Sequence, residues 1–188
     1  SEDPSSKDAV EEVLEQCLSA LDGVSPQAGL LFAAIDFDHA LILQEIKRVF
    51  PILELIGCTT DGEMSSILGF QQDSLTLMLF CSDTVEIYAG VGHQIQNDAI
   101  AAAQQAIQQA SQKSSAPAKL CITIPASYTA DGSTTSGESI LQGLELAMGH
   151  PVPIIGGTAG DQFRFQTTYQ FFGTEVFTDA LPVLLFSG

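Results

Sequence analysis

Apolar residues recur at helical spacing between residues 7 and 22, where Val10 is followed by apolar positions 3, 4, 7, 8 and 11 residues later. This spacing predicts an amphipathic helix. The short apolar run 29–35 has the pattern of a strand covered on both faces, and helical spacing returns over 42–50 before a second apolar run at 53–58. Because strand–helix–strand units are nearly always parallel, the ends of these two strands should lie at the same edge of one sheet.

The second half of the chain repeats this order of elements. Asn97 is the expected cap of a helix that continues to about residue 110, and 119–124 has the pattern of a buried strand. The sequence Thr135-Ser-Gly-Glu138 predicts a capping box at the start of the next helix, since its hydroxyl and carboxylate can bond the free amides of that helix end. Another strand is expected at 152–156.

Two short segments indicate that this repetition is a duplication. Ile56-Gly-Cys-Thr-Thr60 aligns with Ile155-Gly-Gly-Thr-Ala159. We therefore expect a single domain over 1–188 built of two pseudo-repeats, about 1–92 and 93–188. The predicted fold class is α/β: a pseudo-duplicated α/β sandwich with mixed parallel and antiparallel sheets and packing helices.

The remaining apolar runs predict further strands. The runs 75–81 and 85–91 are separated by three residues, which predicts an antiparallel hairpin. Later strands are expected at 168–172 and 181–186.

The charge of the chain excludes several classes of partner. Its 188 residues include 6 Lys and Arg against 23 Asp and Glu, so the formal net charge is −17. A surface this acidic repels phosphate backbones and anionic membranes, so neither nucleic acid nor lipid is an expected partner. With 45% apolar residues the chain has enough material for a core. Its apolar runs are nevertheless far shorter than the ~18 residues that cross a bilayer, and no transmembrane helix is expected.

The cysteines favour a reducing compartment. Cys17, Cys58, Cys81 and Cys121 show neither the spacing of a metal site nor a CxxC motif. We therefore expect free thiols, no bound metal and a cytoplasmic location.

Candidate binding residues lie on the loops that follow the predicted strands, because ligands of open α/β sheets bind beyond the carboxyl ends of parallel strands. The glycine-rich segment 156–161 either brings its backbone close to a ligand or forms a turn that needs positive φ. The chain has no GxxxxGK motif and no GxGxxG after its first strand, so phosphate binding is not expected.

Charged residues on these loops suggest a ligand class. An Asp for an ammonium group and an Arg for a carboxylate form the pair that an amino-acid ligand requires, and Asp161 and Arg164 stand three residues apart. Asp131, after the strand 119–124, is a further acidic candidate. Such acidic residues either converge on a ligand or simply face solvent.

No enzymatic activity is expected. Cys58, at the end of a strand, would need a neighbouring base to act as a nucleophile. The histidines His39, His93 and His150 have no local tie to it in the sequence.

Three segments resemble the N-terminal FIST domain: Gly57-Cys-Thr-Thr-Asp-Gly-Glu-Met64, Asp73-Ser-Leu-Thr-Leu-Met-Leu-Phe80, and Ile155-Gly-Gly-Thr-Ala-Gly-Asp161 with Phe163 and Phe172-Gly173. FIST is a sensory module of bacterial and archaeal signal transduction. The resemblance implies an intracellular sensory domain that works with a C-terminal FIST domain, which these 188 residues lack. It also implies histidine kinase, chemotaxis or cyclic-di-GMP output modules as partners. Carried over to this chain, it implies ligand contacts at Thr59, Thr60, Gly62, Glu63, Gly157, Thr158, Gly160 and Asp161.

Three functions stay open at this point. The leading one is a sensory domain that binds a small molecule such as an amino acid and catalyses nothing. The first alternative, also suggested by the resemblance, is a haem-binding nitric-oxide sensor, which requires an axial His or Cys and an apolar slot. The second alternative is a purely structural protein-interaction module.

Overall fold

Every helix and strand expected from the hydrophobic pattern forms in the computed structural model, which describes residues 1–188. None of the four helices combines the length and the apolarity needed to cross a membrane. In chain order the elements are α1 (Ser6–Leu21), β1 (Ala28–Ala33), α2 (His39–Val49), β2 (Glu54–Thr59), β3 (Glu63–Ser65), β4 (Gly69–Gln71), β5 (Leu75–Phe80), β6 (Glu86–His93), α3 (Ala99–Ser111), β7 (Ala118–Thr123), α4 (Gly137–Met148), β8 (Ile154–Gly156), β9 (Gln170–Phe172), β10 (Glu175–Phe177) and β11 (Ala180–Ser187).

Both predicted strand–helix–strand units are parallel. β1 pairs with β2 so that Ala33 lies opposite Thr59, and β7 pairs with β8 so that Thr123 lies opposite Gly156. In each repeat a third strand, β5 or β11, lies antiparallel beside the first strand of the unit. The two repeats therefore build the same arrangement, β2-β1-β5 in one sheet and β8-β7-β11 in the other.

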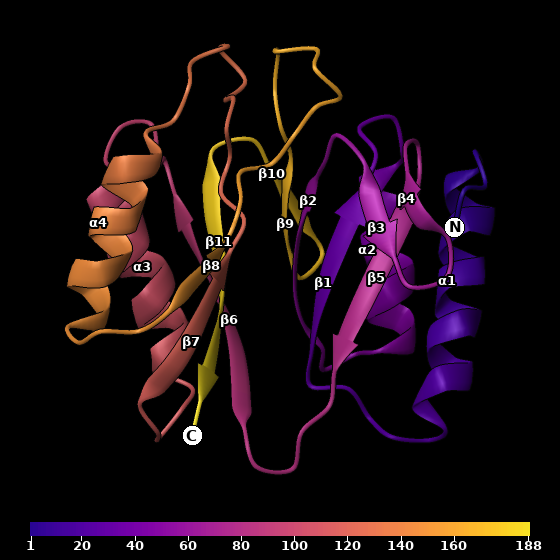
Figure 1. Cartoon of the computed structure of the whole chain (residues 1–188), viewed down its shortest axis with the longest axis horizontal. Coiled ribbons are helices and arrows are strands. Elements are labelled where there is room, and N and C mark those ends of the chain that lie inside the picture. The colour runs from indigo at the N-terminus through magenta and orange to yellow at the C-terminus, as the bar shows by residue number, and fades with distance from the viewer.

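Two mixed sheets pack face to face between two pairs of helices (Figure 1). The first sheet has the order β10-β9-β2-β1-β5, and the second has the order β6-β11-β7-β8. One apolar cluster lies between the first sheet and α1 and α2, and another lies between the second sheet and α3 and α4. A third cluster, which includes Ile56 and Leu184, fills the space between the sheets. The fold is α/β with mixed sheets, as predicted, and has four layers.

The predicted hairpin of 75–81 with 85–91 is wrong, because the chain crosses between the sheets at this point. β5 pairs with β1, whereas β6 pairs with β11 in the second sheet. In return, β9 and β10 join the first sheet beside β2. Gly90 explains the place of β6: a Cβ at this residue would stand 2.0 Å from the backbone oxygen of Ala106, so β6 and α3 are in backbone contact. The expected repeat boundary near residue 92 falls at the end of this crossing strand.

Two helix caps lie one residue later than predicted. Asp98, and not Asn97, accepts a hydrogen bond from the Ala101 amide at the start of α3. Ser136, and not Thr135, caps α4. The Thr135 hydroxyl instead donates to a backbone oxygen of the loop after β7, at 2.6 Å.

Candidate functional site

The two glycine-bearing bends, 59–63 and 156–161, meet at one end of the sheets. Gly160 N donates a hydrogen bond to Thr59 O at 2.8 Å. The approach requires glycine, because a Cβ at Gly160 would stand 2.6 Å from a carboxylate oxygen of Asp61. Segments that align in the sequence are thus in direct contact in the fold.

An apolar cleft of about 550 Å³ lies beside these bends, between the inner faces of the two sheets. The sheets touch through β2 and β9 on one side and β6 and β11 on the other, and the cleft lies where they separate toward the edge strands β5 and β8. Thr60, Gly157 and Thr158, three of the residues predicted to contact a ligand, line the cleft. The remaining lining residues are Leu30, Phe32, Cys58, Met78, Phe80, Leu120, Ile122, Ile124, Ile155, Gly156 and Phe186.

The cleft lining carries no charged side chain. The Thr60 hydroxyl donates to the Glu63 carboxylate behind the wall, whereas the Thr158 hydroxyl bonds to no other group of the chain. Burial, reinforced by the nearby Glu63 charge, raises the pKa of Cys58 far above its usual range, so this thiol stays protonated at neutral pH. The lining therefore suits a small, mostly apolar molecule and offers no acid–base pair.

Thr59 and Glu63, both predicted ligand contacts, are buried and bonded within the chain. The Tyr169 amide donates to Thr59 Oγ1 at 3.0 Å, which ties the end of β2 to the segment before β9. The Glu63 carboxylate accepts hydrogen bonds from Ser74 N at 3.2 Å and Ser74 Oγ at 2.6 Å, in addition to the Thr60 hydroxyl. Both residues thus hold the bend in shape.

Gly62 and Asp131 also serve local structure. A Cβ at Gly62 would stand 2.4 Å from the Phe70 ring, so glycine allows the β3–β4 hairpin to close on the bend. Asp131 lies on the loop after β7, where it accepts from Thr129 Oγ1 at 2.7 Å and Ser133 N at 3.0 Å. These bonds, led by the one from Thr129, lower the pKa of Asp131 to about 2. Asp131 does not line the cleft.

Asp161 is 3% exposed and holds a tight turn. Its carboxylate accepts hydrogen bonds from the backbone amides of Arg164 and Phe165, both at 3.1 Å, and of Gln166 at 2.8 Å. Phe163 and Phe165 in this turn have φ angles of 59° and 54°, in the left-handed region that is uncommon for bulky residues. The carboxylate therefore fixes an otherwise unfavourable backbone.

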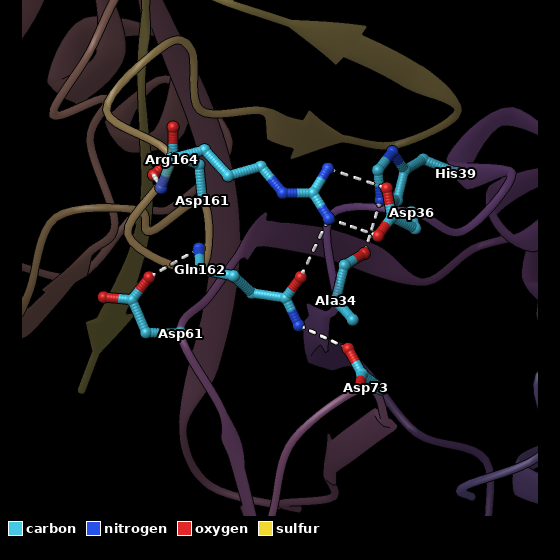
Figure 2. Close-up of polar contacts among 8 residues, drawn as sticks. All are labelled: Ala34, Asp36, His39, Asp61, Asp73, Asp161, Gln162 and Arg164. Atoms are coloured by element: carbon cyan, nitrogen blue, oxygen red, sulfur yellow. Dashed lines mark hydrogen bonds and ion pairs between the residues drawn. The ribbon is translucent and has the colours of Figure 1, made fainter.

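Two side chains of the same turn, Gln162 and Arg164, reach Asp73 and Asp36 of the first repeat (Figure 2). We call these four residues the polar clasp. The Arg164 guanidinium forms a two-pronged ion pair with Asp36, with Nη1 2.8 Å from Oδ1. Gln162 Nε2 donates to Asp73 Oδ1 at 2.6 Å, and Gln162 N donates to Asp61 Oδ1 at 2.7 Å. The hydrogen bond from Arg164 lowers the pKa of Asp36, and the same bond raises the pKa of Arg164. The arginine predicted to bind a ligand carboxylate thus binds a carboxylate of the chain.

The residues around the cleft do not fit haem. None of the histidines lines it: His39 is buried with its Nε2 3.0 Å from Ala34 O, His93 is at the end of β6, and His150 is exposed after α4. The sulfur in the lining, Cys58, is disfavoured as a thiolate ligand by its burial. No group of three or more His, Cys, Asp or Glu side chains is placed to hold a metal ion.

The apolar wall of the cleft was not among the residues predicted from the sequence. Phe32, Ile122 and Phe186 lie on strands that are apolar on both faces, with one face toward helices and the other toward the second sheet. The available signal was the unbroken apolar run itself, because a strand buried on both faces requires a layer on each side.

The chain matches the model of the FIST N domain over residues 27–188, which includes every element except α1. A search of curated proteins finds no match. FIST is a family of sensory, signal-transduction domains. The match covers most of the chain, and the chain belongs to the FIST N domain family.

Proposed function

We propose that this chain is a sensory domain that binds a small, largely apolar molecule in the cleft between its two sheets. The observation that carries this proposal is the cleft itself, which has a volume of about 550 Å³ and no charged lining. This volume lies within the range of roughly 300–1,000 Å³ typical of small-molecule sites. The hydroxyls of Thr60 and Thr158 would select a ligand with one or two hydrogen-bonding groups.

Ligand binding would change the separation of the sheets without any chemical step. A ligand shifts an equilibrium between two arrangements only by the difference in its affinity for them. Each sheet contains strands from both repeats, so a change in the cleft acts on both. In this proposal the domain is no enzyme, requires no cofactor and works in the cytoplasm. It acts with a C-terminal FIST domain and a histidine kinase, chemotaxis or cyclic-di-GMP output module.

An amino acid is the second candidate ligand, and the polar clasp favours it. The α-carboxylate of the ligand would replace Asp36 on the Arg164 guanidinium, and its ammonium group would pair with the released Asp36 carboxylate. The Asp36 side chain is 68% exposed and the Arg164 side chain is 43% exposed, so this exchange requires no unfolding. An amino acid would thus open the link between the repeats and leave the cleft unfilled.

Thermal unfolding with a ligand panel tests both candidates. The panel contains the twenty amino acids together with small apolar alcohols, acids and ketones, and a ligand at 100 times its Kd should add about 2.7 kcal/mol. Ile155→Trp, at a half-exposed position of the cleft lining, should abolish the shift caused by a cleft ligand. Ile52→Trp, at an exposed position outside the lining, should leave it unchanged.

Arg164→Gln separates the two ligand classes, because it should abolish only a shift caused by an amino acid. A shift that survives Ile155→Trp would place the ligand outside the cleft. A flat response to the whole panel would contradict small-molecule sensing by this chain.

A further inference from the structure

β5 has one edge without a strand partner. Leu75 N donates to Ser1 O at 2.9 Å, and the ammonium group of Ser1 donates to Leu75 O at 2.8 Å. These two hydrogen bonds form one antiparallel backbone pair, on the side of β5 away from β1. Because alternate residues of a strand direct their backbone groups to the same side, Leu77 and Leu79 point theirs along this edge too. β5 pairs with no strand other than β1.

An apolar slot of about 310 Å³, which we call the β5 slot, runs along this edge. α1 forms one wall with Val13 and Cys17, and the β3–β4 hairpin forms another with Met64 and Ile67. Its lining holds no charged side chain, and Met64, Ile67 and Met78 are 69%, 70% and 50% exposed. The slot thus combines exposed apolar side chains with backbone groups that pair with no other strand; of these, Leu77 O accepts only the weak Cys17 thiol donor, at 3.9 Å. Such an edge suits the addition of a strand.

The second repeat shows what occupies the equivalent place there. β11 is the counterpart of β5, and β6 pairs along its outer edge beneath α3. α3 also closes the far edge of β6: Gln109 Oε1 accepts from Val91 N at 2.8 Å, and Gln105 Oε1 accepts from His93 N at 3.1 Å. In the first repeat α1 takes the place of α3, and Gln16 of α1 lines the β5 slot. No strand of residues 1–188 lies beneath it.

We propose that the β5 slot binds an extended strand of a partner protein, antiparallel to β5 and in line with Ser1. The backbone of this strand would pair with Leu77 and Leu79, and its apolar side chains would fill the space between α1 and the hairpin. Charge restricts the partner, because the chain has a net charge of −17 and the Glu12 carboxylate accepts a hydrogen bond from Ser1 Oγ at the entrance. The partner strand is therefore apolar within the slot and basic at its ends. The same charge opposes pairing between two copies of this chain.

The peptide Lys-Lys-Val-Thr-Val-Ala-Val-Lys-Lys is the probe, and its matched control carries N-methyl groups on alternate valines, which removes the pairing amides. On the native chain the probe should slow hydrogen exchange of the Leu77 and Leu79 amides at least tenfold. It should also slow alkylation of Cys17 in the slot wall and leave the exposed Cys81 unchanged. The N-methylated peptide should change none of these rates.

Two helix variants test the location of the probe. Ala20→Trp fills the slot and should weaken probe binding at least tenfold, because Ala20 lines the slot. Ser19→Trp, on the same helix but outside the lining, should leave binding unchanged. Binding that resists both Ala20→Trp and N-methylation would overturn the proposal, and so would unprotected amides at millimolar peptide.

Two further experiments distinguish a partner protein from the other possible sources of the strand, which are a second copy of this chain and a segment joined ahead of Ser1. A dimer in sedimentation that Ala20→Trp dissociates would assign this edge to a second copy and overturn the partner. The same strand fused ahead of Ser1 tests the geometry alone. If the fused strand protects Leu77 and Leu79 while the free peptide does not bind, a partner strand is again overturned.

Discussion

Replacing Asp161 by alanine tests whether one buried carboxylate holds the turn that positions the polar clasp. The carboxylate accepts three backbone amides from residues 164–166 at 2.8–3.1 Å and is 3% exposed. Hydrogen bonds to charged groups contribute ~1.5–3 kcal/mol each, which gives ~4.5–9 kcal/mol if all three amides stayed dry. Residues 164–166 are themselves exposed, so water replaces the lost acceptor. We therefore expect Asp161→Ala to lower the free energy of unfolding by about 3 kcal/mol.

Asp161→Asn keeps one acceptor oxygen and should cost about 1 kcal/mol, since it loses the charge and part of the bonding. Urea unfolding followed by circular dichroism measures both variants, and amide hydrogen exchange at 164–166 reports the turn directly. Asp131→Ala is the matched control, because Asp131 makes similar local bonds from an exposed position and should lower the urea midpoint much less than Asp161→Ala. A loss below about 1 kcal/mol in Asp161→Ala, with the 164–166 amides still protected, would refute this account.

Further predictions concern Gly90, His39 and the cysteines. Gly90→Ala should destabilise the chain by about 3 kcal/mol in urea unfolding, because the new Cβ would stand 2.0 Å from a backbone oxygen of α3; a neutral effect would contradict the strand–helix contact. Burial lowers the pKa of His39 below its usual value of about 6.5, so the unfolded state binds more protons and stability is lost as pH falls below about 6.5. This loss should flatten in His39→Gln, and an unchanged pH profile would reject the assignment. The exposed Cys81 should react rapidly with a thiol reagent in the folded state. Cys121, whose pKa burial raises to about 12, should react only on unfolding, as should Cys58; fast labelling of either would contradict their burial.

The strand–helix–strand units could be predicted because each depends on residues close in sequence. The apolar runs 29–35 and 53–58, with a helical period between them, leave a right-handed parallel pairing as the one common solution. The sheet that β6 joins is decided by contacts with β11, almost 100 residues away, and with α3. Gly90 and Gly92, inside a strand, were the available signal, because glycine in a strand often marks close approach of another backbone. The spacing rule that predicted a hairpin takes account of neither the contact of β6 with β11 nor its contact with α3.

The candidate site was predictable in place and less so in its chemistry. The two bends that the alignment singled out are in contact, through the hydrogen bond from Gly160 N to Thr59 O. Acidic side chains on such loops could not be assigned from sequence, because buried backbone donors must find acceptors within the chain. Glu63 and Asp161 serve as those acceptors. The ligand contacts carried over from the family resemblance stay predictions.

β5 connects the two proposed binding sites, because Met78 lines both the cleft and the β5 slot. A strand added at the slot would extend the first sheet beyond the edge at which the cleft opens, and would cover the half-exposed Met78 side chain. A cleft ligand packed on Met78 would then meet a different wall depending on whether the slot is filled. Coupling of this kind is reciprocal, so the ligand would change the affinity for the strand by the same factor as the strand changes the affinity for the ligand. Through one edge strand, occupancy of the cleft would thus reach a partner on the surface.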